Sequence, residues 1–171
     1  MILFRALHKR YVENWQEYEK GSSYKLGARW NEPETPVLYM SSNVQNAMLE
    51  LANYCTSPNV ANSLFVIGVF EVPTLRLKEV QPEEMNPFWA QFPFNVSTQQ
   101  FGSKILLDAR YDGLIVPSST INNALAMSEH NEVRKSIFAN IVLNPKKESF
   151  SKMVLLETFN PVYSNRMFNS N

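Results

Sequence analysis

Short apolar segments interrupted by proline and polar residues follow one another irregularly along this chain of 171 residues. Runs rich in β-branched and aromatic residues are typical of strands, whereas apolar residues recurring every three or four positions indicate helices. We expect strands at 2–6, 37–40, 64–72, 75–77, 113–118, 140–143 and 153–159, and helices at 44–55, 99–107 and 128–139. Because the pattern lacks strict βαβ alternation, it predicts an α+β fold with a split, mostly antiparallel sheet.

The helix expected over 44–55 has the clearest pattern in the chain. Ser42, followed three residues later by Gln45, fits a capping box at its start, and the Ser57-Pro58-Asn59 segment is expected to stop it. Its apolar stripe comprises Val44, Ala47, Met48, Leu51, Ala52 and Cys55. Glu50 therefore flanks this stripe.

The segment 81–98 combines three prolines with several aromatic residues, including Trp89. Proline disfavours regular structure in the residues before it. We therefore expect a lid or a packed cover at 81–98, in place of a regular element.

Length and charge restrict the class of protein. A chain of 171 residues predicts one domain, 1–171. Lys plus Arg equals Asp plus Glu at 16 each, so there is no basic field to attract nucleic acid. The single cysteine, Cys55, the absence of a signal-type N-terminus and the lack of an apolar run of ~20 residues predict a cytoplasmic protein that does not span a membrane.

Arg29, Tyr39 and Glu50 are candidates for chemistry, although each has a common structural explanation. Arg29 could fork onto phosphate oxygens, or its stem could pack on Trp30. Tyr39 could stack on a planar ring or be an ordinary core tyrosine. Glu50 could stabilise an oxocarbenium-like sugar cation, or be a solvated helix residue.

Ser118 ends a strand, where a serine usually serves a turn or cap, and the sequence offers no nearby base that would make it a nucleophile. His8, His130 and Cys55 do not have the spacing of metal ligands, so we expect no metal site. Neither a Gly-x-Gly-x-x-Gly motif nor a P-loop is present, and we expect no resident cofactor.

Together, in order and spacing, these residues resemble the RES domain family. The resemblance rests on Arg29-Trp30-Asn31, on Pro36 to Tyr39 with Ser41 or Ser42, and on Ala47 and Glu50. Weaker likeness comes from Phe4-Arg5, from Leu114 to Ser118 and from Asn140 to Pro145. The resemblance implies a fold similar to the catalytic core of ADP-ribosylating toxins. It also implies the toxin of a bacterial toxin–antitoxin pair that degrades NAD at the nicotinamide–ribose bond, by hydrolysis or by phosphorolysis.

By this resemblance, Arg5 and Arg29 would hold the NAD phosphates, with Ser41 among the binding residues. Tyr39 would position nicotinamide or its ribose, Glu50 would favour the cationic transition state, and Ser118 would help to orient the nicotinamide side. NAD would be a consumed substrate, and the partner would be a helix-turn-helix antitoxin.

Two other functions remain open from the sequence. The same site could transfer ADP-ribose to a macromolecule, or the domain could bind a nucleotide or partner without catalysis. The sequence also leaves open whether water or phosphate is the acceptor and whether copies of the chain associate.

Overall fold

The computed structural model describes residues 1–167, and the end of the predicted domain 1–171 lies outside the described residues. One sheet has the strand order β4-β5-β6-β2-β1-β3-β7. Its strands are β1 (Ile2–His8), β2 (Leu38–Ser41), β3 (Phe65–Glu71), β4 (Leu77–Glu79), β5 (Gly113–Val116), β6 (Asn140–Leu143) and β7 (Val154–Phe159). The α-helices are α1 (Ser22–Leu26), α2 (Val44–Tyr54), α3 (Pro58–Leu64), α4 (Val96–Leu107) and α5 (Asn131–Ile137). Short 3₁₀ turns occupy Lys9–Tyr11, Tyr18–Lys20, Pro82–Glu84, Asn123–Met127, Glu148–Lys152 and Asn165–Met167.

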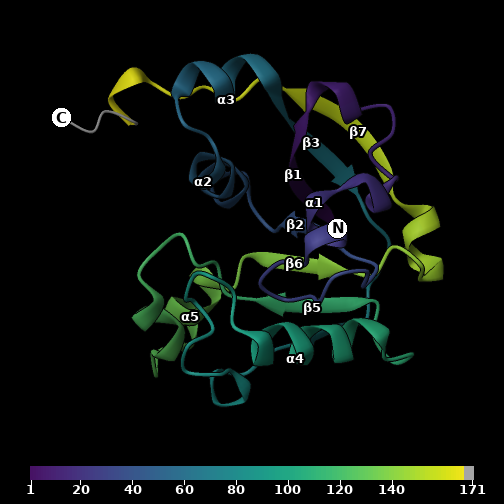
Figure 1. Cartoon of the computed structure of the whole chain (residues 1–171), viewed down its shortest axis with the longest axis vertical. Helices are drawn as coiled ribbons and strands as arrows, with labels where there is room; N and C mark the ends of the chain where they lie inside the picture. Colours follow the sequence, from purple (N-terminus) through teal and green to yellow (C-terminus); the bar gives the residue numbers. More distant parts are fainter. Residues whose placement is uncertain (168–171) are drawn as a thin grey trace.

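The sheet is split between β1 and β2. These two strands share a single pair of facing residues, Phe4 and Ser41, whereas β1 pairs with β3 along its whole length. All neighbouring strands are antiparallel except β4 and β5. Figure 1 shows β1, β3 and β7 in one half of the molecule and β5, β6 and α4 in the other. The predicted α+β fold with a split, mostly antiparallel sheet is confirmed.

The start of α2 differs from the expected capping box. Asn43, in extended conformation, is the N-cap, and its side chain accepts a hydrogen bond from the backbone N–H of Asn46. Asparagine is as good an N-cap as serine, and here the helix begins one residue later than Ser42 would require. The capping box of Ser42 with Gln45 was therefore wrong.

The Ser57-Pro58-Asn59 segment, expected only to stop a helix, begins α3. Ser57 accepts from the backbone N–H of Val60, and Pro58 stands in the first turn. Proline is favoured there because the first helical N–H groups have no intrahelical acceptor. Further along, β4 lies two residues later than the expected strand 75–77, and α4 begins at Val96, earlier than expected.

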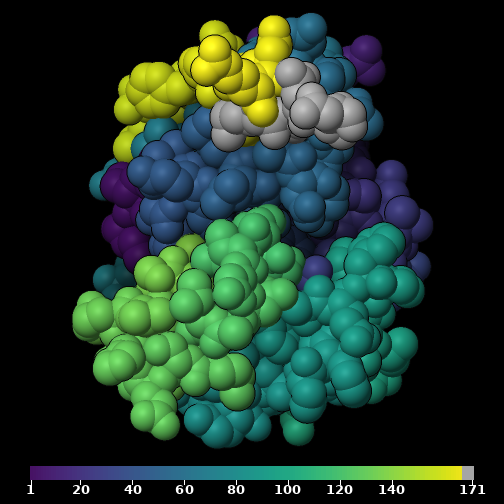
Figure 2. All heavy atoms as spheres, turned by 90° about the vertical axis from the view of Figure 1, so that its left-hand side faces the viewer, coloured from purple at the N-terminus to yellow at the C-terminus, as the bar shows by residue number. Residues whose placement is uncertain are grey.

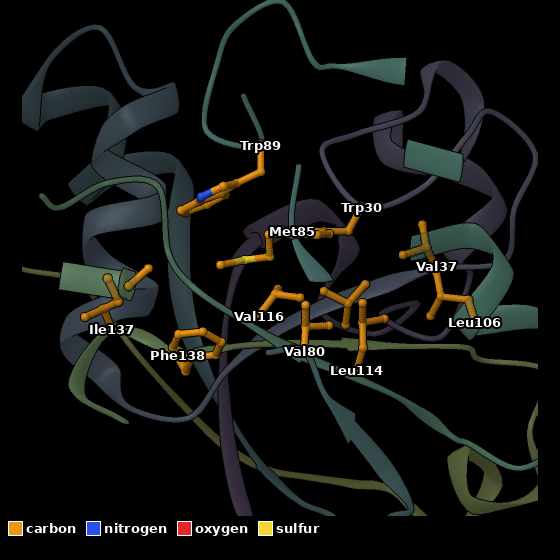
Figure 3. Packing of buried hydrophobic residues seen from close by; sticks show 12 residues of the cluster. Trp30, Val37, Val80, Met85, Trp89, Leu106, Leu114, Val116, Ile137 and Phe138 are labelled. Carbon is orange, nitrogen blue, oxygen red and sulfur yellow. The ribbon is translucent and has the colours of Figure 1, made fainter. Parts of the chain in front are cut away.

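The largest hydrophobic core lies between the β5–β6 side of the sheet, α4 and the 81–90 segment (Figure 3). In it, the rings of Trp30 and Trp89 stack with centroids 6.0 Å apart. Met85 and Trp89 are buried, whereas Phe92 is 83% exposed. The 81–98 segment is thus a packed cover, but the expectation that it lacks regular elements was wrong, because it contains a 3₁₀ turn at Pro82–Glu84 and the start of α4.

A second core packs around Leu3, Phe70 and Met40, and a third lies beneath α2 and α3 around Leu51 and Ala61. Within residues 1–167, no helix is long and apolar enough to cross a membrane.

Candidate active site

A cavity of about 630 Å³ opens where the sheet splits. A volume of this size lies within the roughly 300–1,000 Å³ typical of small-molecule sites. Figure 2 shows a recess where the blue α2 segment meets the green and teal segments below it. The cavity walls come from β1, β2, α2, the 22–30 segment and the 92–94 loop, and include Arg5, Arg29, Tyr39, Ser41, Glu50, Tyr54, Ser119 and Asn140. Except for Ser118, every candidate site residue from the sequence lines it.

The side chains of Arg29, Trp30 and Asn31 lie in three different environments. Trp30 is buried in the core, and α4 approaches it so closely that a Cβ on Gly102 would lie 2.1 Å from the Trp30 carbonyl oxygen. Asn31 is fully buried and accepts a 2.8 Å hydrogen bond from the Tyr39 hydroxyl. Arg29 is left to face the cavity. The triplet therefore fixes a loop and presents one cation.

Arg29 is already held by protein groups. Its Nη1 donates to the carbonyl oxygens of Trp89, at 2.6 Å, and Gln91, at 3.0 Å. Its guanidinium carbon lies 5.2 Å from the centroid of the Phe94 ring. The guanidinium carries five N–H donors, so these contacts orient it while leaving others for a ligand.

Arg5, on β1, supplies a second cation to the cavity, and its Nη1 donates to the Trp15 carbonyl at 3.3 Å. Burial lowers the pKa of Arg5 to about 10. Burial also lowers the pKa of Arg29, while the neighbouring Tyr54 and Glu50 act to raise it. Because arginine begins from such a high value, both side chains stay charged near neutral pH. They can bind an anion.

The Tyr39 hydroxyl is engaged by the protein itself. It donates to Asn31 and accepts from the backbone N–H of Trp30 at 3.1 Å. Burial raises the pKa of Tyr39 well above its ordinary value, so the hydroxyl stays protonated at neutral pH. The group that Tyr39 offers a ligand is therefore mainly its ring.

Two side chains from the other half of the sheet hold the Glu50 carboxylate. Ser118 Oγ donates to Glu50 Oε1 at 3.0 Å, and Asn140 Nδ2 donates to the same oxygen at 2.8 Å. Ser118 follows the end of β5, and Asn140 begins β6. Across residues 1–167, these are the side-chain hydrogen bonds recorded for Glu50, and both fall on Oε1. Its second oxygen remains available to a ligand.

Ser118 does not line the cavity. It is fully buried behind Glu50 and also lies within 2.7 Å of the Thr120 hydroxyl, whereas Ser119 forms the wall. The structure therefore gives Ser118 a contact with the Glu50 carboxylate and no place in the cavity wall.

Asn140 and Asn46 complete the site, and sequence reasoning gave neither of them a role. Asn46 is buried and donates to the Ser41 hydroxyl and to Asn140 Oδ1. One signal was present: Asn46 and Glu50 are four residues apart, so they lie on one face of α2. Nothing local pairs α2 with Asn140, 94 positions further along the chain.

A carboxylate with one free oxygen thus faces a cavity that also holds two cations and several aromatic rings. Arginines bind phosphate oxygens, aromatic faces stack on bases, and a fixed carboxylate stabilises a developing positive charge. This combination suits a substrate that is anionic at one part and becomes cationic at another.

Comparison with known proteins gives this α+β protein a family. The model of the RES domain matches residues 2–158. The chain belongs to the RES domain family, as the resemblance of its central motif predicted.

The curated relatives carry one name. "Toxin Res" of Yersinia enterocolitica is 26% identical over 151 residues, covering 88% of each chain. "Toxin Res" of Photorhabdus laumondii is 24% identical over 156 residues, covering 90% of this chain and 88% of the relative. Among solved structures, a chain of the M. tuberculosis MbcT–MbcA toxin–antitoxin complex superposes with a TM-score of 0.58. That chain is 12% identical, and the match covers 98% of this chain and 86% of the other, so it supports the fold.

Proposed function

We propose that this protein is the toxin of a toxin–antitoxin system and that it degrades NAD by breaking the bond between nicotinamide and ribose. The names of both curated relatives support the toxin assignment. The observation that carries the chemistry is Glu50, whose Oε1 is held by Ser118 and Asn140 while the carboxylate faces a cavity with two arginines.

The chemistry needs little acid catalysis. Nicotinamide in NAD is a cationic leaving group: when the glycosidic bond breaks, the electron pair goes to the ring nitrogen and nicotinamide departs neutral. Positive charge then develops on the ribose, as in other glycoside cleavages. A fixed carboxylate stabilises that charge without reorganising. Water or phosphate next attacks the anomeric carbon, and with water as the attacking group one proton is released.

The other wall of the cavity suits the rest of the substrate. Arg5 and Arg29 both line the cavity and would bind the pyrophosphate, and the ring of Tyr39, which lines the same cavity, would offer a surface for nicotinamide or its ribose. Ser41 lines the cavity close to Asn46 and is a candidate contact for the substrate. NAD is a consumed substrate in this proposal.

An antitoxin is the proposed protein partner, of the helix-turn-helix type that the family resemblance implies. The support is the fold shared with a chain of a toxin–antitoxin complex. An antitoxin that occludes the cavity would keep the enzyme inactive, and its removal would release activity.

Purified protein, freed of any partner, provides the test. NAD is incubated with wild type or Glu50→Ala, with and without inorganic phosphate. The products are separated by chromatography and identified by mass spectrometry. We expect nicotinamide release by wild type only. ADP-ribose as co-product identifies water as acceptor, and a phosphate ester of ADP-ribose identifies phosphate.

Two results would contradict the proposal. Intact NAD after long incubation with folded, partner-free protein would reject the NAD-degrading activity. ADP-ribose recovered on a macromolecule, when cell extract is added with labelled NAD, would identify a transferase instead.

A further inference from the structure

We propose that Asn46 is a positioning residue that fixes the orientation of Asn140 and, through it, of the catalytic carboxylate of Glu50; this inference rests on the proposed NAD-cleaving function. Asn46 is 5% exposed and lies on the same face of α2 as Glu50. Its Nδ2 donates to Asn140 Oδ1 at 2.7 Å, and Asn140 Nδ2 donates to Glu50 at 2.8 Å.

The two amides lie between two groups that can only accept. At one end is the backbone carbonyl of Ala139, 3.5 Å from Asn46 Nδ2, and at the other is the carboxylate of Glu50. A side-chain amide has a donating end and an accepting end. Reversing both amides would place oxygen against the Ala139 carbonyl and oxygen against the carboxylate. Reversing one would place two like groups of the amides together.

The acceptors at its two ends therefore fix the direction of this hydrogen-bond series. As a result, Asn140 Nδ2 donates to Glu50 Oε1. Ser118 donates to the same oxygen. Two donors on one oxygen hold the carboxylate in one rotamer, so the position of its other oxygen in the cavity is defined. Asn46 itself does not line the cavity, which separates its role from that of a group that touches substrate.

The Ser41 hydroxyl belongs to the same arrangement. Asn46 Nδ2 donates to Ser41 Oγ at 3.0 Å, and Ser41 lines the cavity from β2. Asn46 thus joins a residue of β2 to the first residue of β6, and both of these residues line the cavity. A residue kept only for helix stability would not need donors aimed at two strands, because Asn43 already caps α2.

Asn46→Asp tests the inference with almost no change of shape. The new carboxylate cannot donate, so Asn140 must turn its Nδ2 toward residue 46 and its oxygen toward Glu50. Because a buried donor is misdirected, we expect kcat for nicotinamide release to fall about 10-fold to 100-fold, with KM for NAD within about twofold. Asp is acceptable in the first turn of a helix, so α2 should still form.

Asn43→Asp is the matched control, because it makes the same chemical change three residues earlier on the same helix. An aspartate caps as well as an asparagine, and Asn43 has no contact with Asn140 in the series. We expect wild-type kcat and KM. If Asn46→Asp behaves like wild type, or if kcat, KM and melting temperature change together in both variants, the inference is wrong.

Two additions keep the test decisive. If Asn46→Asp does not fold, Asn46→Ala removes the donors without adding charge, and an unchanged kcat there overturns the inference. If wild type does not cleave NAD, the proposed function fails, but ¹⁵N NMR of the Asn140 side-chain amide still decides the positioning. We expect its resonances to move in Asn46→Asp and not in Asn43→Asp, and unmoved resonances in both would contradict the arrangement.

Discussion

The two walls of the cavity hold their charged groups in different ways. Glu50 is held by side chains, Ser118 and Asn140, which follow and begin two strands of the sheet. Arg29 is held by the backbone carbonyls of Trp89 and Gln91 in the 81–98 segment, beside the half-buried ring of Phe94. Side-chain partners near strand ends fix a carboxylate for chemistry, whereas a loop that grips a cation suits binding. We therefore expect changes around Glu50 to affect mainly kcat, and changes around Arg29 to affect mainly KM.

Glu50→Gln should have the largest effect, because it removes the charge and keeps the shape. We expect the rate of nicotinamide release to fall by about 10²–10³, the loss typical of removing one electrostatic contact with a transition state. KM should change little. Steady-state kinetics with purified protein measures both, and equal rates for wild type and variant would refute the role of the charge.

Gly102→Ala tests the close packing of α4 against the backbone of Trp30, the residue that follows Arg29. A Cβ there would lie 2.1 Å from the Trp30 carbonyl oxygen, so α4 or the 27–31 loop must move. We expect a loss of about 1–3 kcal/mol in the free energy of unfolding, as for other overpacked positions. Urea unfolding followed by circular dichroism gives the value. Gln100→Ala, at an exposed position of α4, should change it by less than about 0.5 kcal/mol.

Arg29→Lys separates binding from chemistry. Lysine keeps the charge but cannot donate to Trp89 and Gln91 while presenting a planar fork to phosphate. We expect KM for NAD to rise about tenfold, equivalent to about 1.4 kcal/mol, with kcat changed by less than about threefold. A fall in kcat at unchanged KM would show that the division between the two walls is wrong.

Tyr39→Phe should have the smallest effect and a specific pH dependence. The variant loses the hydrogen bonds to Asn31 and Trp30, worth about 1 kcal/mol of unfolding free energy. Because burial raises the pKa of Tyr39 in the folded state, its contribution is complete below about pH 10, where unfolded tyrosine is still protonated. It is lost as pH rises further.

The measurement is the difference in unfolding free energy between wild type and Tyr39→Phe at pH 8 and pH 10.5. We expect this difference to be smaller at pH 10.5. A difference that stays constant or grows would mean that the hydroxyl is not shielded as its hydrogen bonds indicate.

The sequence predicted the fold where local pattern and tertiary packing agree. The strand at 140–143 has the expected bounds, and α2 lies within the expected 44–55. Besides the shifted strand β4, the errors fell at helix starts, where Asn43, Ser57 and Asn95 compete with neighbouring polar residues as caps. Which one caps depends on the direction in which the chain enters the helix, and tertiary packing sets that direction.

The sequence predicted which residues belong to the site, but not how they are held. Arg29, Tyr39 and Glu50 were singled out by the motif, and they do line one cavity. Their partners were not predictable, because Asn140 and Ser118 reach Glu50 across 90 and 68 positions of sequence. The burial of Ser118 behind the carboxylate likewise depends on how β5 ends against α2, which no local pattern records.

The most direct test is the NAD content of cells after induced expression of wild type or Glu50→Ala, with equal amounts of each protein confirmed by blotting. The account predicts collapse of NAD and growth arrest with wild type, and normal NAD and growth with Glu50→Ala. Unchanged NAD with both proteins would contradict the central claim that the Glu50 cavity consumes NAD.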